Sequence, residues 1–253
     1  MSARRHEHWL EPSAIPPLEP SEIHIWKIHL AAPAAGLTPE KILSAEEYER
    51  AARYHFVADK NRFAVCRAVL RRLLGAHLEI PPADVRFDLL PHGKPVVSTA
   101  QNAADLRFSC SHSGDWALIA IARGCELGVD LEQHRERTQA EDVAARFFSE
   151  TEIRELAVLP QNLKTTGFFN AWTRKEAFVK ALGLGLSFPL ESFSVALAPG
   201  QPAALLAVAN DSEAVKKWTL TALDVRPDYS AALAFAGKHS RVRLFNWNFP
   251  PPV

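Results

Sequence analysis

Two carboxylates stand two positions apart in the segment LGVDLE, residues 127–132, which otherwise reads as a buried β-strand. Residues i and i+2 of an extended strand point to the same side, so Asp130 and Glu132 are predicted to project together. Such a pair offers two hard oxygen ligands. For the pair alone, the commoner explanation is a strand end that reaches solvent, where acidic residues are tolerated.

A third acid lies on a predicted helix in the segment FFNAWTRKEAFVKALGLGL, residues 168–186. Trp172, Glu176 and Lys180 follow one another at i, i+4 spacing, so a ring, a carboxylate and an ammonium share one face. An exposed Glu–Lys pair at this spacing is worth only about 0.3–0.5 kcal/mol and carries no chemical meaning. Apolar residues cover most of the helix, however, so Glu176 is predicted to be partly buried and to need a cation or a metal. Gly183 is predicted to cap the helix.

A cluster of small hydrogen-bond donors follows a strand in FSCSHSG, residues 108–114. Ser111 and His112, with a serine on either side, are suited to phosphate oxygens, although a polar hairpin turn is the alternative. A Ser-His pair without an acid partner or a G-x-S-x-G elbow is poor evidence for a hydrolase triad. Phosphate contact is therefore favoured over a nucleophile. Upstream, the segment PHGKPVV places Lys94 in a stiff turn.

The composition limits the classes of function. The chain has 253 residues, 47% of them apolar, which suits one large or two small domains with a full core. Lys plus Arg and Asp plus Glu both number 29, so overall charge favours neither nucleic acid nor a membrane surface. No apolar run approaches the roughly 20 residues of a membrane span. Three widely spaced cysteines fit reduced core thiols, and we expect a soluble, cytoplasmic protein.

The elements that position these residues follow a mixed α+β plan. Residues 1–20 lack an apolar signal-peptide core and are interpreted as a flexible or draped arm. A strand at 21–30 then precedes two helices, at 43–54 with a Ser44–Glu47 capping box and at 59–77, and short strands follow up to residue 132. Helices and then strands recur to residue 237. We therefore expect two similar α/β halves, residues 21–125 and 126–253, that share a cleft.

Taken together, these segments resemble the Sfp-type 4′-phosphopantetheinyl transferases. The segments GKP, SCSHSG, LGVDLE, FFSETE, AWTRKEAFVKALGLGL and LESFSV occur in the order and approximate spacing of that family, over roughly residues 43–195. The pair G-V-D-L-E and, about 40 residues later, W-x-x-K-E-A-x-x-K is the family's signature. The length resembles the group with two fused halves in a pseudo-twofold arrangement and the active site in the cleft between them.

The resemblance implies a defined reaction. Such enzymes, also called holo-[acyl-carrier-protein] synthases, move the 4′-phosphopantetheine group of coenzyme A to a serine hydroxyl of an apo acyl or peptidyl carrier protein. Adenosine 3′,5′-bisphosphate is released. Asp130, Glu132 and Glu176 would hold Mg²⁺, and Glu176 is also the candidate general base, a choice that the sequence leaves open. Lys180 would neutralise a phosphate or orient Glu176, and Lys175 would add positive charge.

The coenzyme A contacts follow from the same resemblance. An arginine near the 3′-phosphate corresponds to Arg62. Arg53 is a further candidate. Just before Arg53, where some members place lysines, this chain carries Glu46, Glu47 and Glu49, so Arg50 or Lys60 is the candidate replacement in the phosphate clamp. The full set of implied coenzyme A contacts is Arg53, Arg62, Lys94, Pro95, Ser111, His112, Lys175 and Lys180.

Two other classes of function stay open at this point. A Mg²⁺-dependent hydrolase of a nucleotide or pyrophosphate would use the same carboxylates without a protein acceptor, and a binding module would keep the fold without turnover. Dependence on an apo carrier protein separates them. The sequence does not indicate which carrier, of fatty-acid, polyketide or peptide synthesis, is modified. Two fused halves make a monomer sufficient for one site, and no nucleic acid or membrane partner is expected.

Overall fold

The computed structural model describes residues 8–32, 36–135, 140–237 and 241–248. It confirms the α+β class and two halves built to one plan. The first half contains β1 (Glu22–His29), α1 (Ala45–Ala52), α2 (Val57–Leu78), β2 (Phe87–Leu89), β3 (Pro95–Val97), β4 (Leu106–Ser113) and β5 (Trp116–Arg123).

The second half repeats that order with small additions. It contains β6 (Leu127–Gln133), α3 (Ala140–Phe147), α4 (Glu150–Val158), α5 (Gln161–Leu182), β7 (Phe193–Val195), β8 (Leu205–Val208), α6 (Ala214–Lys217), β9 (Trp218–Ala222) and β10 (Tyr229–Ala236). In both halves the first strand is followed by helices, of which the longest has 22 residues, by a short hairpin and by two further strands.

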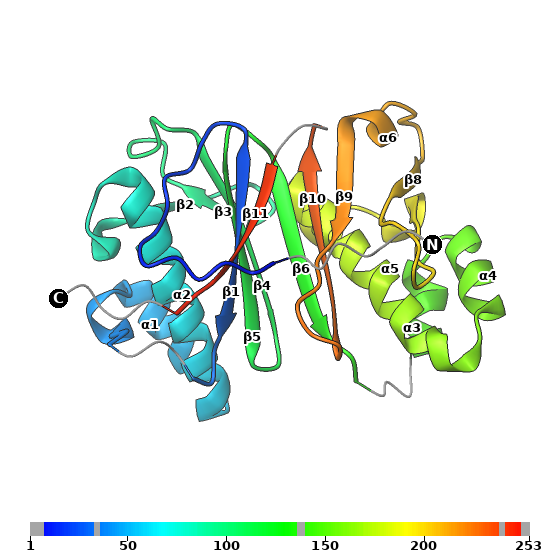
Figure 1. Cartoon of the computed structure of the whole chain (residues 1–253), viewed down its shortest axis with the longest axis horizontal. Helices are drawn as coiled ribbons and strands as arrows, with labels where there is room; N and C mark the ends of the chain where they lie inside the picture. The colour runs from blue at the N-terminus through cyan, green and yellow to red at the C-terminus, as the bar shows by residue number, and fades with distance from the viewer. Residues whose placement is uncertain (1–7, 33–35, 136–139, 238–240, 249–253) are drawn as a thin grey trace.

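Strand pairing gives the same topology twice. The first sheet runs β1-β5-β4 and the second β6-β10-β9, with antiparallel neighbours throughout. The two sheets pack against each other through an apolar layer, while α2 and α5 cover their outer faces (Figure 1). The identical strand order is the pseudo-twofold relationship that the two repeated patterns predicted.

A last strand, β11 (Arg241–Asn246), was not predicted from the sequence. It pairs in parallel with β1, so the end of the chain joins the sheet of the first half. Leu10 of the N-terminal arm in turn bridges to Phe245 on the outer edge of β11. The division of the chain at residue 125 stays a prediction. In the structure, β11 comes from the second predicted half but pairs with the sheet of the first.

Local sequence signals explain where the long helices begin and end. The capping box at Ser44 and Glu47 is present, and Ser149 forms a second one with Glu152. The helix expected at 59–77 extends over Val57–Leu78. Gly183 ends α5 in the left-handed conformation, with φ of 73°, and donates its N–H to the Val179 carbonyl, as predicted for a glycine cap.

The two halves meet along a seam between β4 and β6. Among the described strands, β4 pairs only with β5 and β6 only with β10, so each strand has a second edge. The Ser109 hydroxyl accepts a hydrogen bond from the Val129 N–H at 3.1 Å, and the Ser113 hydroxyl accepts one from the Gln133 N–H at 3.1 Å. Serine side chains of β4 thus satisfy backbone donors at the free edge of β6.

Gly128 lets β6 lie directly on α5. A Cβ atom at this position would lie 2.1 Å from the Ala177 carbonyl oxygen and 2.4 Å from the Ala181 nitrogen, both backbone atoms of α5. Since residues 128, 130 and 132 share one side of the strand, this contact turns Asp130 and Glu132 toward α5. Glycine therefore fixes which helix the carboxylates face.

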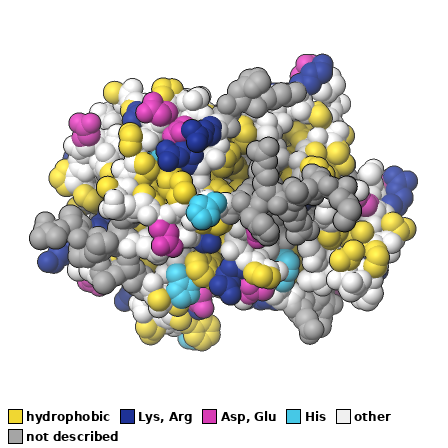
Figure 2. Space-filling model, in the orientation of Figure 1, with side chains coloured by type: hydrophobic (Ala, Val, Ile, Leu, Met, Phe, Trp, Pro, Cys, Tyr) yellow, Lys and Arg dark blue, Asp and Glu magenta, His cyan; other side chains and the backbone are white. Residues whose placement is uncertain are grey.

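The surface shows no concentration of one charge on the face in view. Basic and acidic side chains are intermixed over it (Figure 2), in line with their equal numbers. Within the described residues, none of the helices is both long and apolar enough to cross a lipid bilayer.

The contact at Gly128 generates a prediction. Gly128→Ala should lower the free energy of unfolding by at least about 3 kcal/mol, because the added methyl meets rigid backbone that cannot move aside. Gly200→Ala is the matched control: its Cβ would meet open space, and only its φ of +87° opposes it, at about 1–2 kcal/mol. Urea unfolding followed by tryptophan fluorescence measures both. Equal losses in the two variants would remove the contact as an explanation.

Candidate functional site

Between residues 171 and 181, one narrow strip of α5 reaches solvent. Trp172, Glu176 and Lys180 are half-buried, whereas the other residues from 171 to 181 are buried. The i, i+4 spacing thus places the ring, the carboxylate and the ammonium on the single accessible strip of this stretch, as the sequence predicted. The strip lies against β6, so Glu176 and Lys180 meet the carboxylates of that strand.

Asp130 is a buried carboxylate, 4% exposed, with only one oxygen satisfied. Its Oδ1 accepts hydrogen bonds from Lys180 Nζ at 2.6 Å and from the Ser111 hydroxyl at 2.8 Å. Its Oδ2 is buried and has no hydrogen-bond partner among the residues that the structure describes. An unsatisfied buried carboxylate oxygen is costly, so Oδ2 marks a place for a further cation or donor.

Glu132 and Glu176 complete a group of three acids. Glu132 is half-buried and accepts a hydrogen bond from the Ser113 hydroxyl at 2.9 Å. The pKa of Glu176 is raised, first by burial and then by the negative charges of Asp130 and Glu132, against which Lys180 acts. Three carboxylates therefore repel one another here, and one ammonium offsets part of that repulsion.

The types of donor atom suit Mg²⁺, although the three carboxylates do not converge on one common position. Within the described ranges, no three His, Cys, Asp or Glu side chains stand close enough together to hold a metal ion. The chemistry nevertheless agrees: the donors are carboxylate oxygens, one of them unpartnered, and their mutual repulsion is relieved by a divalent cation. Mg²⁺ commonly takes a few carboxylates and keeps water or phosphate oxygens in its remaining positions.

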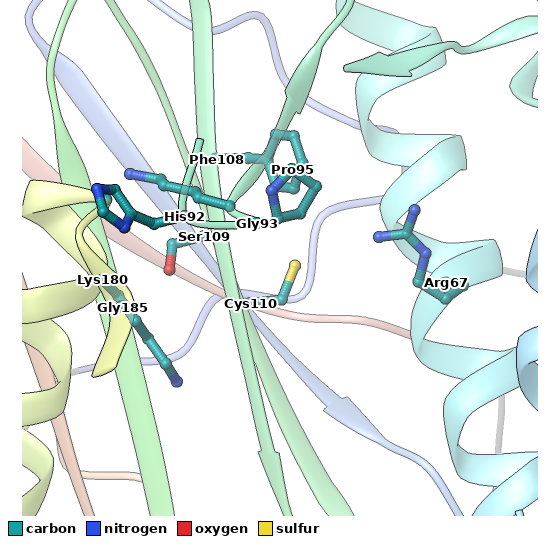
Figure 3. A pocket seen from close by; sticks show the side chains of 11 residues that line it. Arg67, His92, Gly93, Pro95, Phe108, Ser109, Cys110, Lys180 and Gly185 are labelled. Atoms are coloured by element: carbon teal, nitrogen blue, oxygen red, sulfur yellow. The ribbon is translucent and has the colours of Figure 1, made fainter. Parts of the chain in front are cut away.

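A cavity of about 280 Å³ opens beside this group, between the two halves (Figure 3). Arg67 of α2 and Lys180 of α5 lie on opposite sides of it, and Lys94 adds a third cation. No carboxylate lines it among the described residues. Each of the three cations is paired with an acid outside the cavity, so an anionic ligand would meet partly neutralised positive charges there. Its lining residues are Arg67, His92, Gly93, Lys94, Pro95, Phe108, Ser109, Cys110, Lys180, Gly183 and Gly185.

Lys94 ties the β2–β3 hairpin of the first half to the second half. Its Nζ donates to the Ala181 carbonyl at the end of α5, at 3.3 Å, and to the Leu127 carbonyl at 3.4 Å. Glu126 lies 3.7 Å away. Burial lowers the pKa of Lys94, and Glu126 opposes that shift. Lys94 and its neighbour Pro95 thus form one wall of the cavity, where the resemblance expected coenzyme A contacts.

Arg67 lines the cavity but was not predicted from the sequence to be a functional residue. Its Nε donates to Glu47 Oε1 at 2.7 Å, and its guanidinium lies 4.5 Å from the centre of the Phe87 ring. Glu47 is buried and also accepts from Arg71 Nε at 2.6 Å, so one carboxylate serves two arginines. Glu47 therefore holds the Arg67 guanidinium at the cavity. The resemblance places phosphate-binding lysines near this position in other members.

A second hollow of about 240 Å³ lies on the other side of Ser111 and is lined by Arg62, His112, Ser113 and Glu132 among others. The Arg62 guanidinium contacts Asp115 at 2.6 Å and Asp59 at 2.9 Å, so its charge is largely matched. Partial loss of hydration and then the cation Lys180 lower the pKa of His112, which is solvent-exposed. Glu132 and Ser113 thus line the same hollow as Arg62 and His112, the two residues expected to contact phosphate.

Two of the expected residues lie apart from the carboxylates. Arg53 is exposed at the end of α1 and borders a shallow hollow with Arg50 and Tyr54. Lys175 is fully buried, and its Nζ donates to the carbonyls of Leu190 and Phe193 at 2.8 Å and 2.6 Å.

Lys175 also contacts a buried acid. Glu152, 1% exposed, places Oε2 2.8 Å from Lys175 Nζ and accepts the Val195 N–H on Oε1 at 2.8 Å. Burial lowers the pKa of Lys175, and Glu152 opposes that shift. This lysine therefore links α4, α5 and β7 inside the second half.

The comparisons with known proteins agree with one family. Residues 126–234 match the model described as "4'-phosphopantetheinyl transferase superfamily", and residues 37–123 match "4'-phosphopantetheinyl transferase, N-terminal". The holo-[acyl-carrier-protein] synthase of Thermotoga maritima is similar in structure at 22% identity over 45% of this chain and 63% of its own, with a TM-score of 0.37.

Curated relatives extend over most of the chain. The 4′-phosphopantetheinyl transferase HetI of Nostoc sp. is 36% identical over 85% of this chain and 88% of its own length. The 4′-phosphopantetheinyl transferase Sfp of Bacillus subtilis is 31% identical over 68% of this chain and 76% of its own. The chain therefore belongs to the 4′-phosphopantetheinyl transferase family.

Proposed function

We propose that the site between β4, β6 and α5 carries out the reaction of this family with Mg²⁺ bound by Asp130, Glu132 and Glu176. The enzyme transfers the 4′-phosphopantetheine group of coenzyme A to a serine hydroxyl of a carrier protein. The observation that carries the metal proposal is the buried, unpartnered Oδ2 of Asp130 within a group of mutually repelling carboxylates.

Coenzyme A fits the cavity by charge and by shape. About 280 Å³ accommodates part of the molecule, and the apolar surfaces of Pro95 and Phe108 suit its nucleobase. Lys180 stands between the cavity and Asp130, where it can donate to the pyrophosphate. The cavity is thus assigned to the nucleotide end of coenzyme A.

The second hollow extends the phosphate contacts. His112 and Arg62 line it beside Glu132, and both are candidate donors to phosphate. Ser111 already donates to Asp130 and accepts from Lys180, so its effect on the phosphates is exerted through these two side chains.

The transfer step needs one proton acceptor. The carrier serine oxygen forms a bond to the phosphorus that bears pantetheine, the pyrophosphate P–O bond breaks, and adenosine 3′,5′-bisphosphate leaves. Glu176, which lies beside Asp130 and Lys180, takes the serine proton directly or through water. Bound Mg²⁺ would neutralise the charge that builds up on the pyrophosphate oxygens. Lys180 donates to the same oxygens.

The acceptor partner is an apo acyl or peptidyl carrier protein. Both halves of the site come from one chain, so a monomer is the proposed functional unit. The test is intact mass spectrometry of an apo carrier protein after incubation with this enzyme, coenzyme A and Mg²⁺, beside an EDTA control. A metal-dependent gain of one phosphopantetheinyl group on the serine is expected. Breakdown of coenzyme A without any gain in carrier mass would contradict the proposal.

Loss of charge at Glu176 tests the catalytic assignment. Glu176→Gln should lower kcat by about 10²- to 10⁴-fold, the usual contribution of a general base, and leave the fold intact. Circular dichroism checks the fold, and the rate of carrier modification checks kcat. Turnover near that of the wild type would remove Glu176 from the mechanism.

Loss of charge at Asp130 tests the metal assignment. Asp130→Asn should raise the Mg²⁺ concentration for half-maximal activity by at least about tenfold, because an amide oxygen is a poorer ligand than a carboxylate. Titration of activity with MgCl₂ measures it. An unchanged midpoint would argue against ligation by Asp130.

The raised pKa of Glu176 also predicts a pH dependence of stability in EDTA. Because the folded-state pKa lies above the unfolded value, the neutral acid is favoured, and stability is lost as pH rises through the folded-state pKa. Glu176→Gln lacks this loss. The variant should therefore be more stable than the wild type at neutral pH, and the difference should shrink as pH falls toward the ordinary value of 4.5 and level off below it. Thermal unfolding from pH 4 to 8 measures it, and a difference that does not change with pH contradicts it.

A further inference from the structure

The serines of β4 do more than join the halves. Ser109, Ser111 and Ser113 alternate along the strand and therefore point to one side, the side that faces β6. Two of them also reach a carboxylate of that strand. Each bond crosses the seam, because the serine belongs to the first half and the carboxylate to the second.

Ser113 holds Glu132 from a fixed position. Its single hydroxyl proton is donated to Glu132 Oε2 at 2.9 Å, while its oxygen accepts the Gln133 N–H at 3.1 Å. The backbone bond fixes the hydroxyl oxygen, and the hydroxyl in turn orients the carboxylate. Glu132 is thus held by a group that is itself anchored to the strand edge.

Ser111 holds Asp130 in the same manner. Its hydroxyl donates to Asp130 Oδ1 at 2.8 Å and accepts from Lys180 Nζ at 3.1 Å. Both partners of Asp130 therefore engage one oxygen, and Oδ2 is left for another ligand. Ser111 thus fixes the direction in which Asp130 presents Oδ2, and Ser113 fixes the orientation of the Glu132 carboxylate.

We propose that Ser111 and Ser113 are positioning residues of the metal site, so that its cation affinity depends on the register between the two halves. The inference rests on the proposed function, since Asp130 and Glu132 are the ligands being oriented. Partners that orient metal ligands typically contribute about 10- to 100-fold in affinity or activity.

The chain offers a matched control in Ser109. It lies on the same strand and side, and its hydroxyl accepts the Val129 N–H at 3.1 Å, but among the described residues it contacts no carboxylate. Ser109→Ala therefore removes a bond across the seam without touching a ligand. Ser113→Thr is the complementary variant, because it keeps the hydroxyl.

The experiment measures Mn²⁺ binding to the full chain by electron paramagnetic resonance, without coenzyme A, beside urea unfolding of each variant. Ser113→Ala should weaken Mn²⁺ binding by about 10- to 100-fold. Ser109→Ala should lose similar stability with an unchanged binding constant, and Ser113→Thr should bind like the wild type.

The results separate the inference from the proposed function. If Ser113→Ala binds Mn²⁺ like the wild type, or if Ser109→Ala weakens binding equally, the positioning role is wrong while the metal site stands. If the wild type binds no Mn²⁺ and its transfer activity is unaffected by EDTA, both the metal proposal and the positioning role are overturned.

Discussion

The close approach of β6 to α5 at Gly128 is the constraint on which the site depends. With backbone against backbone, the strand and the helix leave no room for an apolar side chain between them at this level. The next helix-facing positions of β6 are Asp130 and Glu132, and they meet the accessible strip of α5. The acids are therefore held together by packing of apolar residues elsewhere, against their own repulsion.

The contact between β1 and α2 is the counterpart, in the first half, of the contact between β6 and α5. Its residues differ from the acidic group of the second half. There the helix-facing residues of β1 include His24 and Trp26, which are fully buried, and His24 lies beside His77 of α2. Glu22 lies on the same side of β1 and contacts His24 Nε2 at 3.0 Å, so this face carries one paired acid beside two buried rings. The helices have diverged accordingly, since α2 brings Arg67 to the cavity whereas α5 brings Lys180.

Periodicity was enough to predict most elements, because buried strands and amphipathic helices leave clear patterns. Helical geometry could also have separated the lysines of the signature: Lys175 and Lys180 differ by about 140° around a helix, so only Lys180 shares the face of the accessible strip. The S-x-S-x-S alternation would likewise have put three hydroxyls on one side, had these residues been assigned to the strand and not to the segment after it. What no pattern could supply is the partner across the seam, because contacts such as Ser113–Glu132 and Glu47–Arg67 join residues about 20 positions apart whose meeting depends on the tertiary fold.

The charge arrangement explains why a metal would be needed for substrate binding as well as for the chemistry. Coenzyme A is a polyanion, and its phosphates would approach three carboxylates that already repel one another. Lys180 offsets only part of that charge, since its ammonium lies 2.6 Å from Asp130 and is shared with the Val129 carbonyl. A divalent cation at Asp130 would cancel most of the negative charge that opposes the pyrophosphate and would itself offer a ligand position to its oxygens. The cations of the cavity would then hold the rest of the nucleotide, and the carboxylates proposed as metal ligands would remain beside the incoming hydroxyl.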